Sequence, residues 1–216
     1  METVETSAGE VSLSVEGDAA AAPLLVLAHG AGADMNSAFM LDVCSQLRAA
    51  GVATARFNFA YTEKGKKAPD PQPRLEKTYA EVLEHIAAAT SPRALFIGGK
   101  SMGGRIASHV AATIPEVRGL VFLGYPLHPP GRPERIRDAH LYELMTPMLF
   151  VEGTRDPFCP LETLERVRSK LTAPNDLAVI DDGDHSFKVR KSSGRTTPEA
   201  LTELVEIVAA WVHRLA

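Results

Sequence analysis

Residues 98–104 read Gly-Gly-Lys-Ser-Met-Gly-Gly and follow the apolar run 94–97. A glycine stands two places before and two places after Ser101, where a sharp strand-to-helix turn leaves no room for side chains. Such a turn holds the serine in a strained backbone conformation and lifts its hydroxyl above the end of a sheet. The stretch therefore predicts a nucleophile elbow at Ser101, with Gly99 and Gly103 as the required glycines.

The same letters partly match a phosphate-binding loop, Gly-x-x-x-x-Gly-Lys-Ser/Thr, whose backbone amides wrap a nucleotide. That loop would need a glycine at position 94, which is Ala94, and flexible residues where this chain has strand formers. A dinucleotide fingerprint at Gly30 and Gly32 would need a third glycine at position 35, which is Met35. These mismatches favour the elbow, and we expect no organic cofactor and no metal.

The chain has 216 residues, of which 45% are hydrophobic and 23% charged, and its formal net charge is −4. This length suits one well-buried α/β domain, which we assign to residues 1–216. The acidic balance gives no basic footprint for nucleic acid, so an anionic ligand would need a local basic patch. The sequence leaves the oligomeric state open.

No stretch is apolar for long enough to span a bilayer. The apolar run 19–28 follows an acidic start and precedes the first Lys or Arg of the chain, Arg48, so it predicts a buried strand and not a secretory signal. Cys44 and Cys159 show neither metal-ligand spacing nor a disulfide framework. We therefore expect a cytoplasmic protein with no membrane partner.

Strand-like and helix-like segments alternate from Pro23 onward, which predicts an α/β fold with a mostly parallel, twisted sheet and helices on both faces. The expected strands are 24–28, 53–59, 94–97, 119–124, 148–152 and 176–180, with an antiparallel edge pair around Val4 and 11–16. Helical apolar spacing occurs at 39/43/47, 75/79/82/86, 106/110/114, 161/164/167/171 and 201/204/208/212/215. Two expected loops, 61–74 and 126–137, are too short to form a separate lid domain.

A serine hydroxyl is a weak nucleophile until a base takes its proton, and the base needs a carboxylate to orient it. On this fold the groups follow in the order serine, acid, histidine, each at the carboxyl end of a strand. His185, just beyond the last expected strand, is the expected base, and Asp156, after the strand 148–152, is the expected acid. Asp184 is the alternative acid, whereas Glu152 lies within its strand. The other histidines lie in helical segments (His85, His109, His213), upstream of the acid (His128, His140) or in an earlier loop (His29).

The reaction also needs N–H donors for the negative charge that develops on the carbonyl oxygen. The backbone N–H of Met102, directly after the serine, is the expected first donor, and that of Ala31 is the expected second. Ala31 lies in the loop His29-Gly30-Ala31-Gly32, which His29 is expected to shape through hydrogen bonds of its side chain.

Three further basic features lie near these motifs. Lys100 is expected to be a solvated surface lysine, with a place at the rim of an anion-favouring site as the alternative. The same alternative applies to the lysines at 64, 66 and 67. Arg105, at the end of the elbow motif, is expected to pair locally.

With the elbow, the acid and the histidine in this order, the chain resembles the α/β-hydrolase superfamily over nearly its full length. The stretches that carry the resemblance are His29-Gly30-Ala31-Gly32, Arg56-Phe57-Asn58-Phe59, Gly99-Lys100-Ser101-Met102-Gly103-Gly104-Arg105, Glu152-Gly153-Thr154-Arg155-Asp156 and Gly183-Asp184-His185-Ser186-Phe187. They look like a compact bacterial branch of dienelactone-hydrolase-like serine hydrolases, together with an animal testis-expressed protein and a subunit of a histone-acetyltransferase complex. The resemblance implies a hydrolase fold with little or no lid. Ser101 departs from true dienelactone hydrolases, which use cysteine as the nucleophile.

Two hypotheses of different classes follow. The ordered triad predicts a serine hydrolase that cleaves small carboxylic esters or thioesters, in which Ser101 attacks, His185 carries the proton and Asp156 orients His185. The scaffold-like animal relatives suggest instead an interaction module with little or no catalysis. Within the enzyme hypothesis, peptidase activity is a further alternative, and the acyl chain and leaving group stay open.

Overall fold

The computed structural model describes residues 1–114 and 116–216. Its strands are β1 (Glu2–Thr6), β2 (Gly9–Glu16), β3 (Leu24–Ala28), β4 (Ala53–Phe57), β5 (Leu95–Lys100), β6 (Val117–Leu123), β7 (Met148–Gly153) and β8 (Asn175–Ile180). Its α-helices are α1 (Ala38–Ala49), α2 (Ala60–Glu63), α3 (Gln72–Thr90), α4 (Met102–Ala111), α5 (Leu161–Arg168) and α6 (Thr197–Leu215). Short 3₁₀ helices lie at Ala139–Glu143 and Lys191–Ser193.

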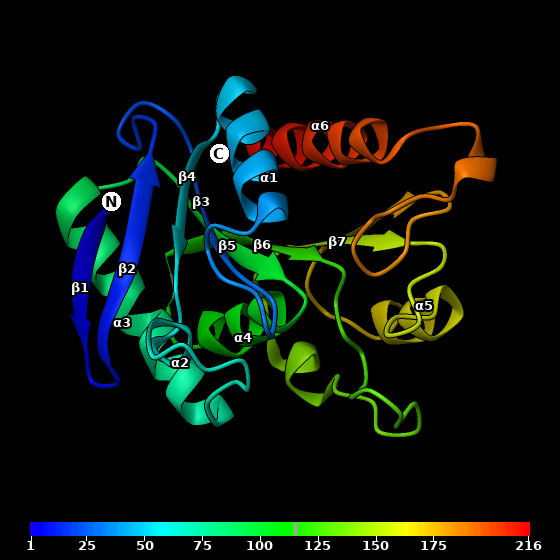
Figure 1. Ribbon diagram of the computed structural model, residues 1–216, viewed down its shortest axis with the longest axis horizontal. Coiled ribbons are helices and arrows are strands. Elements are labelled where there is room, and N and C mark those ends of the chain that lie inside the picture. The colour runs from blue at the N-terminus through cyan, green and yellow to red at the C-terminus, as the bar shows by residue number, and fades with distance from the viewer. Residues whose placement is uncertain (115) are drawn as a thin grey trace.

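Within the described residues the strands form one eight-stranded sheet in the order β1-β2-β4-β3-β5-β6-β7-β8. β1 pairs antiparallel with β2, and β2 antiparallel with β4, whereas all the later pairs are parallel. The expected antiparallel pair therefore lies at one edge of a mostly parallel sheet, as Figure 1 shows.

Side chains of the central strands alternate between two cores because helices cover both faces of the sheet. Leu25 and Leu27 of β3 belong to the core that α1 and α6 complete. Val26 and Ala28 of the same strand belong to the core on the side of α3 and α4. Figure 1 shows α1 and α6 on one side of the sheet and α3, α4 and α5 on the other. The predicted α/β fold class is thus confirmed.

The direction in which the sheet grows reverses at β3. The chain passes from β3 to β4 on one side and then to β5 on the other side of β3. Loops that leave the carboxyl ends of β3 and β5 therefore turn to opposite sides and leave a crevice between them, which is where open α/β sheets bind ligands. The loop at 29–32 and the elbow at Ser101 both begin at this point.

At their carboxyl ends, two strands differ from the sequence prediction by two residues or more. β5 continues beyond Ile97 to Lys100, because Gly98 and Gly99 keep pairing with both β3 and β6. β4 ends at Phe57 and not at Phe59, because the backbone N–H of Phe59 donates to the side chain of His29 in place of a strand carbonyl.

Helix boundaries differ as well. The expected loop 61–74 contains most of the short helix α2 and the first residues of α3. Ile114 and Leu171, which continue the helical spacing in the sequence, lie beyond the ends of α4 and α5. Both side chains still pack against the core, so these positions are apolar because they are partly buried and not because they are helical.

Candidate functional site

The elbow has the geometry that its glycines predict. Ser101 lies between β5 and α4 with φ 51° and ψ −114°, a conformation that costs a non-glycine residue about 1–3 kcal/mol. A Cβ on Gly99 or Gly103 would lie 2.4 or 2.2 Å from the carbonyl oxygen of Ala28, at the end of β3. The backbone of the turn thus presses against the neighbouring strand, and no side chain fits at either glycine.

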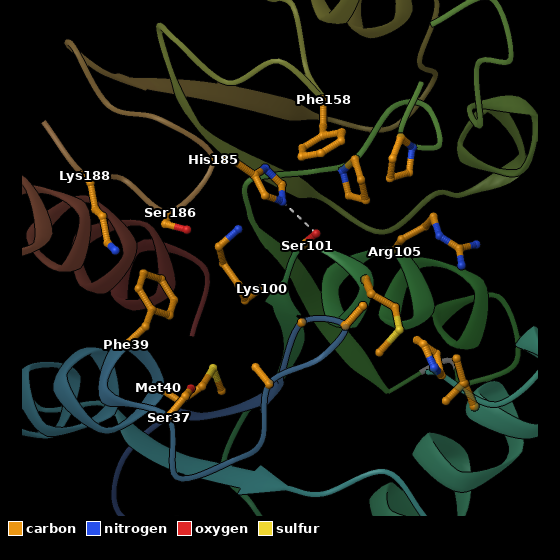
Figure 2. A pocket seen from close by; sticks show the side chains of 18 of the residues that line it. Ser37, Phe39, Met40, Lys100, Ser101, Arg105, Phe158, His185, Ser186 and Lys188 are labelled. Carbon is orange, nitrogen blue, oxygen red and sulfur yellow. Dashed lines mark hydrogen bonds between the residues drawn. The ribbon is translucent and has the colours of Figure 1, made fainter. Parts of the chain in front are cut away.

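Ser101, His185 and Asp156 meet above the carboxyl edge of the sheet. Ser101 Oγ lies 2.8 Å from His185 Nε2, the contact drawn as a dashed line in Figure 2. His185 Nδ1 lies 2.5 Å from Asp156 Oδ2. Asp156 follows β7 and His185 follows β8, so parallel strands bring residues 84 positions apart into one hydrogen-bonded chain.

Two further contacts fix this arrangement. The backbone N–H of Phe158 donates to Asp156 Oδ1 at 2.8 Å, so the second carboxylate oxygen is also held. The Phe158 ring packs edge-on against the His185 ring at 4.7 Å between centroids. The Asp156 side chain is 0% exposed and that of His185 is 20% exposed, so the carboxylate is sealed from water while the imidazole reaches the pocket.

Asp184, the alternative acid, has a different role in the structure. Its Oδ1 accepts hydrogen bonds from the backbone N–H groups of Ser186 (2.7 Å) and Lys188 (3.0 Å). This carboxylate therefore closes the turn that carries His185, while Asp156 makes the hydrogen bond to the imidazole.

The loop after β3 lies against the elbow. A Cβ on Gly30 would be 3.7 Å from Ser101 Cβ, and both residues line the same pocket. Among the described residues, no hydrogen bond uses the backbone N–H of Ala31 or Met102. Two free N–H groups beside a serine hydroxyl are the arrangement that can bind a developing oxyanion.

His29 fixes the shape of that loop. Its Nε2 accepts the N–H of Phe59 at 3.2 Å, so Nδ1 carries the proton and donates to the carbonyl of Gly30 at 2.8 Å. Burial lowers the pKa of His29 and keeps the ring neutral. The side chain ties the β3 loop to the segment after β4.

A pocket of about 1070 Å³ surrounds Ser101. Figure 2 shows Phe39 and Met40 of the α1 segment on one side of Ser101, and Arg105 of α4 on the other. The helical spacing of apolar residues predicts that Phe39 lies on the buried face of a helix. It does not predict that Phe39 lines the pocket, because an apolar side chain at this spacing suits either position. His128 and Phe158 were missed as lining residues for lack of any motif around them.

Lys100 does not have the solvated amine that the sequence suggests. Its Nζ is buried, lacks a hydrogen-bond partner among the described residues and lies 5.7 Å from the centre of the Phe187 ring. Gly124, with φ 71°, leaves room for the amine, since a Cβ there would lie 2.9 Å from Lys100 Nζ and 3.4 Å from His185 Nδ1. Burial lowers the pKa of Lys100 to about 8, and the charges of Asp156 and two other acids oppose this effect only in part.

We expect Lys100→Met to stabilise the protein in a pH-dependent way. Below pH 8 the amine is charged in the folded and the unfolded chain, so the cost of burying the charge is fully present. Between pH 8 and 10.5 the folded chain has released the proton that the unfolded chain keeps, so the stability of the parent protein rises with pH. Urea denaturation should show the variant more stable by about 3 kcal/mol at pH 7 and by less at pH 10. Lys188→Met, which removes an exposed lysine from the same pocket, should show no such pH dependence; an equal gain at both pH values for Lys100→Met would contradict the burial argument.

Glu152 lies below the triad and is 0% exposed. Its Oε1 accepts the N–H of Tyr125 at 2.6 Å, while Oε2 has no partner among the described residues. Burial, together with the charge of Asp156, raises the pKa of Glu152 well above its usual value. Asp156, and not Glu152, makes the hydrogen bond to His185.

A second serine–histidine pair lies on α4, where Ser108 Oγ is 2.8 Å from His140 Nε2. Ser108 is 0% exposed, and its hydroxyl donates to the carbonyl of Arg105 at 2.7 Å, so it accepts from His140. Burial, with the nearby charges of His109 and Arg105, lowers the pKa of His140 to about 3. A hydroxyl whose proton points away from a weakly basic imidazole is poorly arranged for attack, and this favours Ser101 as the nucleophile.

The described part of the chain holds no group of three or more His, Cys, Asp or Glu residues arranged to ligate a metal ion. Both cysteines are buried and free. None of the described helices has the length and apolar character that a membrane span requires.

The sheet, its elbow and the serine–histidine–aspartate contacts together define an α/β hydrolase. A family model described as an alpha/beta hydrolase domain matches residues 21–213, and the chain belongs to this family. The resemblance seen in the sequence is therefore confirmed.

Solved structures with the same fold include esterases and lidless hydrolases. Est1E from Butyrivibrio proteoclasticus with ferulic acid bound is 16% identical, covers 99% of this chain and 100% of its own, and has a TM-score of 0.77. A dienelactone hydrolase from Anabaena variabilis is 19% identical over 99% and 96% of the two chains, with a TM-score of 0.75. An α/β serine hydrolase without lid from Xanthomonas campestris is 19% identical over 97% and 93%, with a TM-score of 0.73. At these identities the similarity shows the fold alone.

Proposed function

We propose that this protein is a serine hydrolase that cleaves small carboxylic esters or thioesters through an acyl-enzyme on Ser101. The observation that carries the proposal is the hydrogen-bonded chain from Ser101 Oγ through His185 to Asp156, with the serine at positive φ on the elbow. A strained serine that already contacts a base has its hydroxyl in position for attack.

In acylation, Ser101 Oγ attacks the substrate carbonyl carbon while His185 Nε2 takes the hydroxyl proton. The carbonyl oxygen becomes negatively charged and is stabilised by the backbone N–H groups of Ala31 and Met102. The tetrahedral intermediate then collapses, and the bond to the alcohol or thiol breaks. His185 returns the proton to that leaving group, and the acyl group stays on Ser101 as an ester.

In deacylation, water takes the place of the leaving group. His185 Nε2 removes a proton from the water as its oxygen attacks the acyl carbon, and the same N–H groups stabilise the second oxyanion. Collapse breaks the bond to Ser101 Oγ, which recovers its proton from His185. Asp156 stays ionised throughout and stabilises the imidazolium that forms in each half-reaction.

A fluorophosphonate probe tests the nucleophile directly. We expect the purified protein to form a covalent adduct that mass spectrometry of its peptides locates on Ser101. Ser108→Ala should label like the parent protein, and Ser101→Ala should not label. An adduct on Ser108 would identify Ser108, which contacts His140, as the nucleophile in place of Ser101.

Substrate turnover tests the reaction class. A panel of p-nitrophenyl acyl esters of increasing chain length, matching thioesters and methyl ferulate separates esterase from thioesterase activity. Methyl ferulate is included because Est1E, which has a similar fold, binds ferulic acid. Absence of both labelling and turnover would favour the alternative of an interaction module, which co-purification of a stable partner would support.

A further inference from the structure

The pocket is basic in a protein that is acidic overall. The formal net charge of the chain is −4, whereas Lys100, Arg105, Arg137 and Lys188 line the pocket against two acids, Asp42 and Asp70. The two acids already have partners, since Asp70 Oδ2 lies 3.7 Å from Arg74 Nε and Asp42 Oδ1 accepts from the Gln46 amide at 2.9 Å. Four basic and two acidic side chains give the pocket lining a formal net charge of +2.

Arg105 does not pair with a carboxylate; its local partners are Gln72 and, at 3.5 Å, His109. Its residue is 9% exposed, and within the described chain no Asp or Glu oxygen lies within 4.0 Å of its guanidinium. Nη1 donates to Gln72 Oε1 at 2.7 Å, and the amide of Gln72 donates to Glu76 at 2.7 Å. Gln72 thus holds the guanidinium in place. Burial lowers the pKa of Arg105, and the charge of Glu76 opposes this effect without a direct ion pair.

Arg137 lines the same pocket as Arg105. The guanidinium of Arg137 makes no ion pair or hydrogen bond among the described residues. Burial and the charge of Arg105 both lower the pKa of Arg137. Two like charges in the lining of one pocket repel each other, and an anion bound between them would reduce that repulsion.

This pair lies within reach of a substrate on Ser101, because Arg105, Arg137 and Ser101 line one pocket. Figure 2 shows Arg105 on one side of Ser101, with Phe39 and Lys188 on the other. A substrate whose carbonyl meets Ser101 would place one of its ends beside Arg105 and the other beside Phe39.

We propose that the preferred substrates are esters or thioesters that carry a second functional group, a free carboxylate, which Arg105 and Arg137 bind. This proposal rests on the hydrolase activity proposed above. A planar guanidinium can donate two parallel hydrogen bonds to a carboxylate. The hydrogen bond to Gln72 holds the guanidinium of Arg105 in a fixed orientation. A single negative charge fits best, because Asp70 lines the same pocket and reduces its net charge.

Matched substrates test the preference. We would compare kcat/KM for monoethyl adipate and ethyl adipamate, which differ only in a terminal carboxylate or carboxamide on the acyl side. The pair 4-acetoxybenzoate and 4-acetoxybenzamide places the same difference on the leaving group. In one of the two pairs we expect kcat/KM to be higher for the carboxylate compound by about tenfold or more. This preference should become smaller as salt is added. Equal rates within both pairs, with active enzyme, would overturn it.

Variants locate the anion site. Arg137→Met, at an exposed residue, should reduce the carboxylate preference about tenfold, and Arg105→Met should do the same. Arg135→Met, which removes one charge from the same loop outside the pocket lining, should keep the preference. A purely structural effect would lower kcat/KM for both members of a pair equally, and if Arg105→Met does not fold, Arg137→Met decides alone.

Binding separates failure of this proposal from failure of the hydrolase proposal. Calorimetric titration of Ser101→Ala with monoethyl adipate and ethyl adipamate measures affinity without turnover. Tighter binding of the carboxylate that Arg137→Met abolishes would support the anion site even if no ester is hydrolysed. Equal or absent binding of both compounds and of the 4-acetoxybenzoate pair would overturn it.

Discussion

Replacing Ser101 by alanine should lower kcat for ester hydrolysis by about 10⁴- to 10⁶-fold. The hydroxyl that contacts His185 Nε2 at 2.8 Å is the group in this arrangement that becomes acylated, and alanine removes it while keeping Cβ in place. KM should change little, because the pocket walls are untouched. Steady-state kinetics on the best p-nitrophenyl ester measures the loss, and circular dichroism verifies the fold.

Ser108→Ala is the matched control for this experiment. It removes a serine hydroxyl from α4, the helix that begins directly after Ser101, and breaks the contact with His140. We expect kcat to stay close to the parent value, with some loss of stability because a buried hydrogen-bond partner is removed. A large loss of kcat in Ser108→Ala together with an active Ser101→Ala would show that the nucleophile lies on α4.

Asp156→Asn should reduce kcat by about 10⁴-fold while the protein stays folded. Asp156 accepts two hydrogen bonds, one from His185 Nδ1 and one from the N–H of Phe158. An asparagine can accept only one of them through its oxygen, so its NH₂ group faces either the imidazole or the backbone donor. When it faces the imidazole, His185 carries its proton on Nε2 and cannot take the proton of Ser101.

The control for this variant is Asp184→Asn. Asp184 accepts from two backbone N–H groups of its own turn, so the change should weaken the turn and leave the tautomer of His185 as it is. We expect a much smaller loss of kcat than for Asp156→Asn, measured on the same ester. The reverse order would identify Asp184 as the residue that orients the base.

Much of the fold could be predicted because local patterns carry it. The strand 24–28 and the run 148–151 of β7 are apolar throughout, since both sheet faces are covered, and helices show their buried face at regular spacing. Boundaries were less predictable. The extension of β5 through Gly98 and Gly99 depends on pairing with β6 and β3, which are distant in sequence.

The candidate site was predictable in its types of residue and their order. The glycines at 99 and 103 fix the turn through local sterics, and an acid and a histidine after later strands complete a known order. Burial could not be predicted in the same way. Lys100 looks like any surface lysine in the sequence, yet the close approach of Gly124 and Phe187 encloses its amine.

The sequence by itself determined that Ser101 stands on an elbow, because a turn this tight excludes side chains at two fixed positions. Only the tertiary structure decided between Asp156 and Asp184, since both are near enough in sequence and only one reaches His185 Nδ1. Tertiary structure also brought two unpaired arginines, one on α4 and one at the end of a loop, to the same pocket. Local sterics are encoded by neighbours in the chain, whereas charge compensation and burial depend on which distant segments the fold brings together.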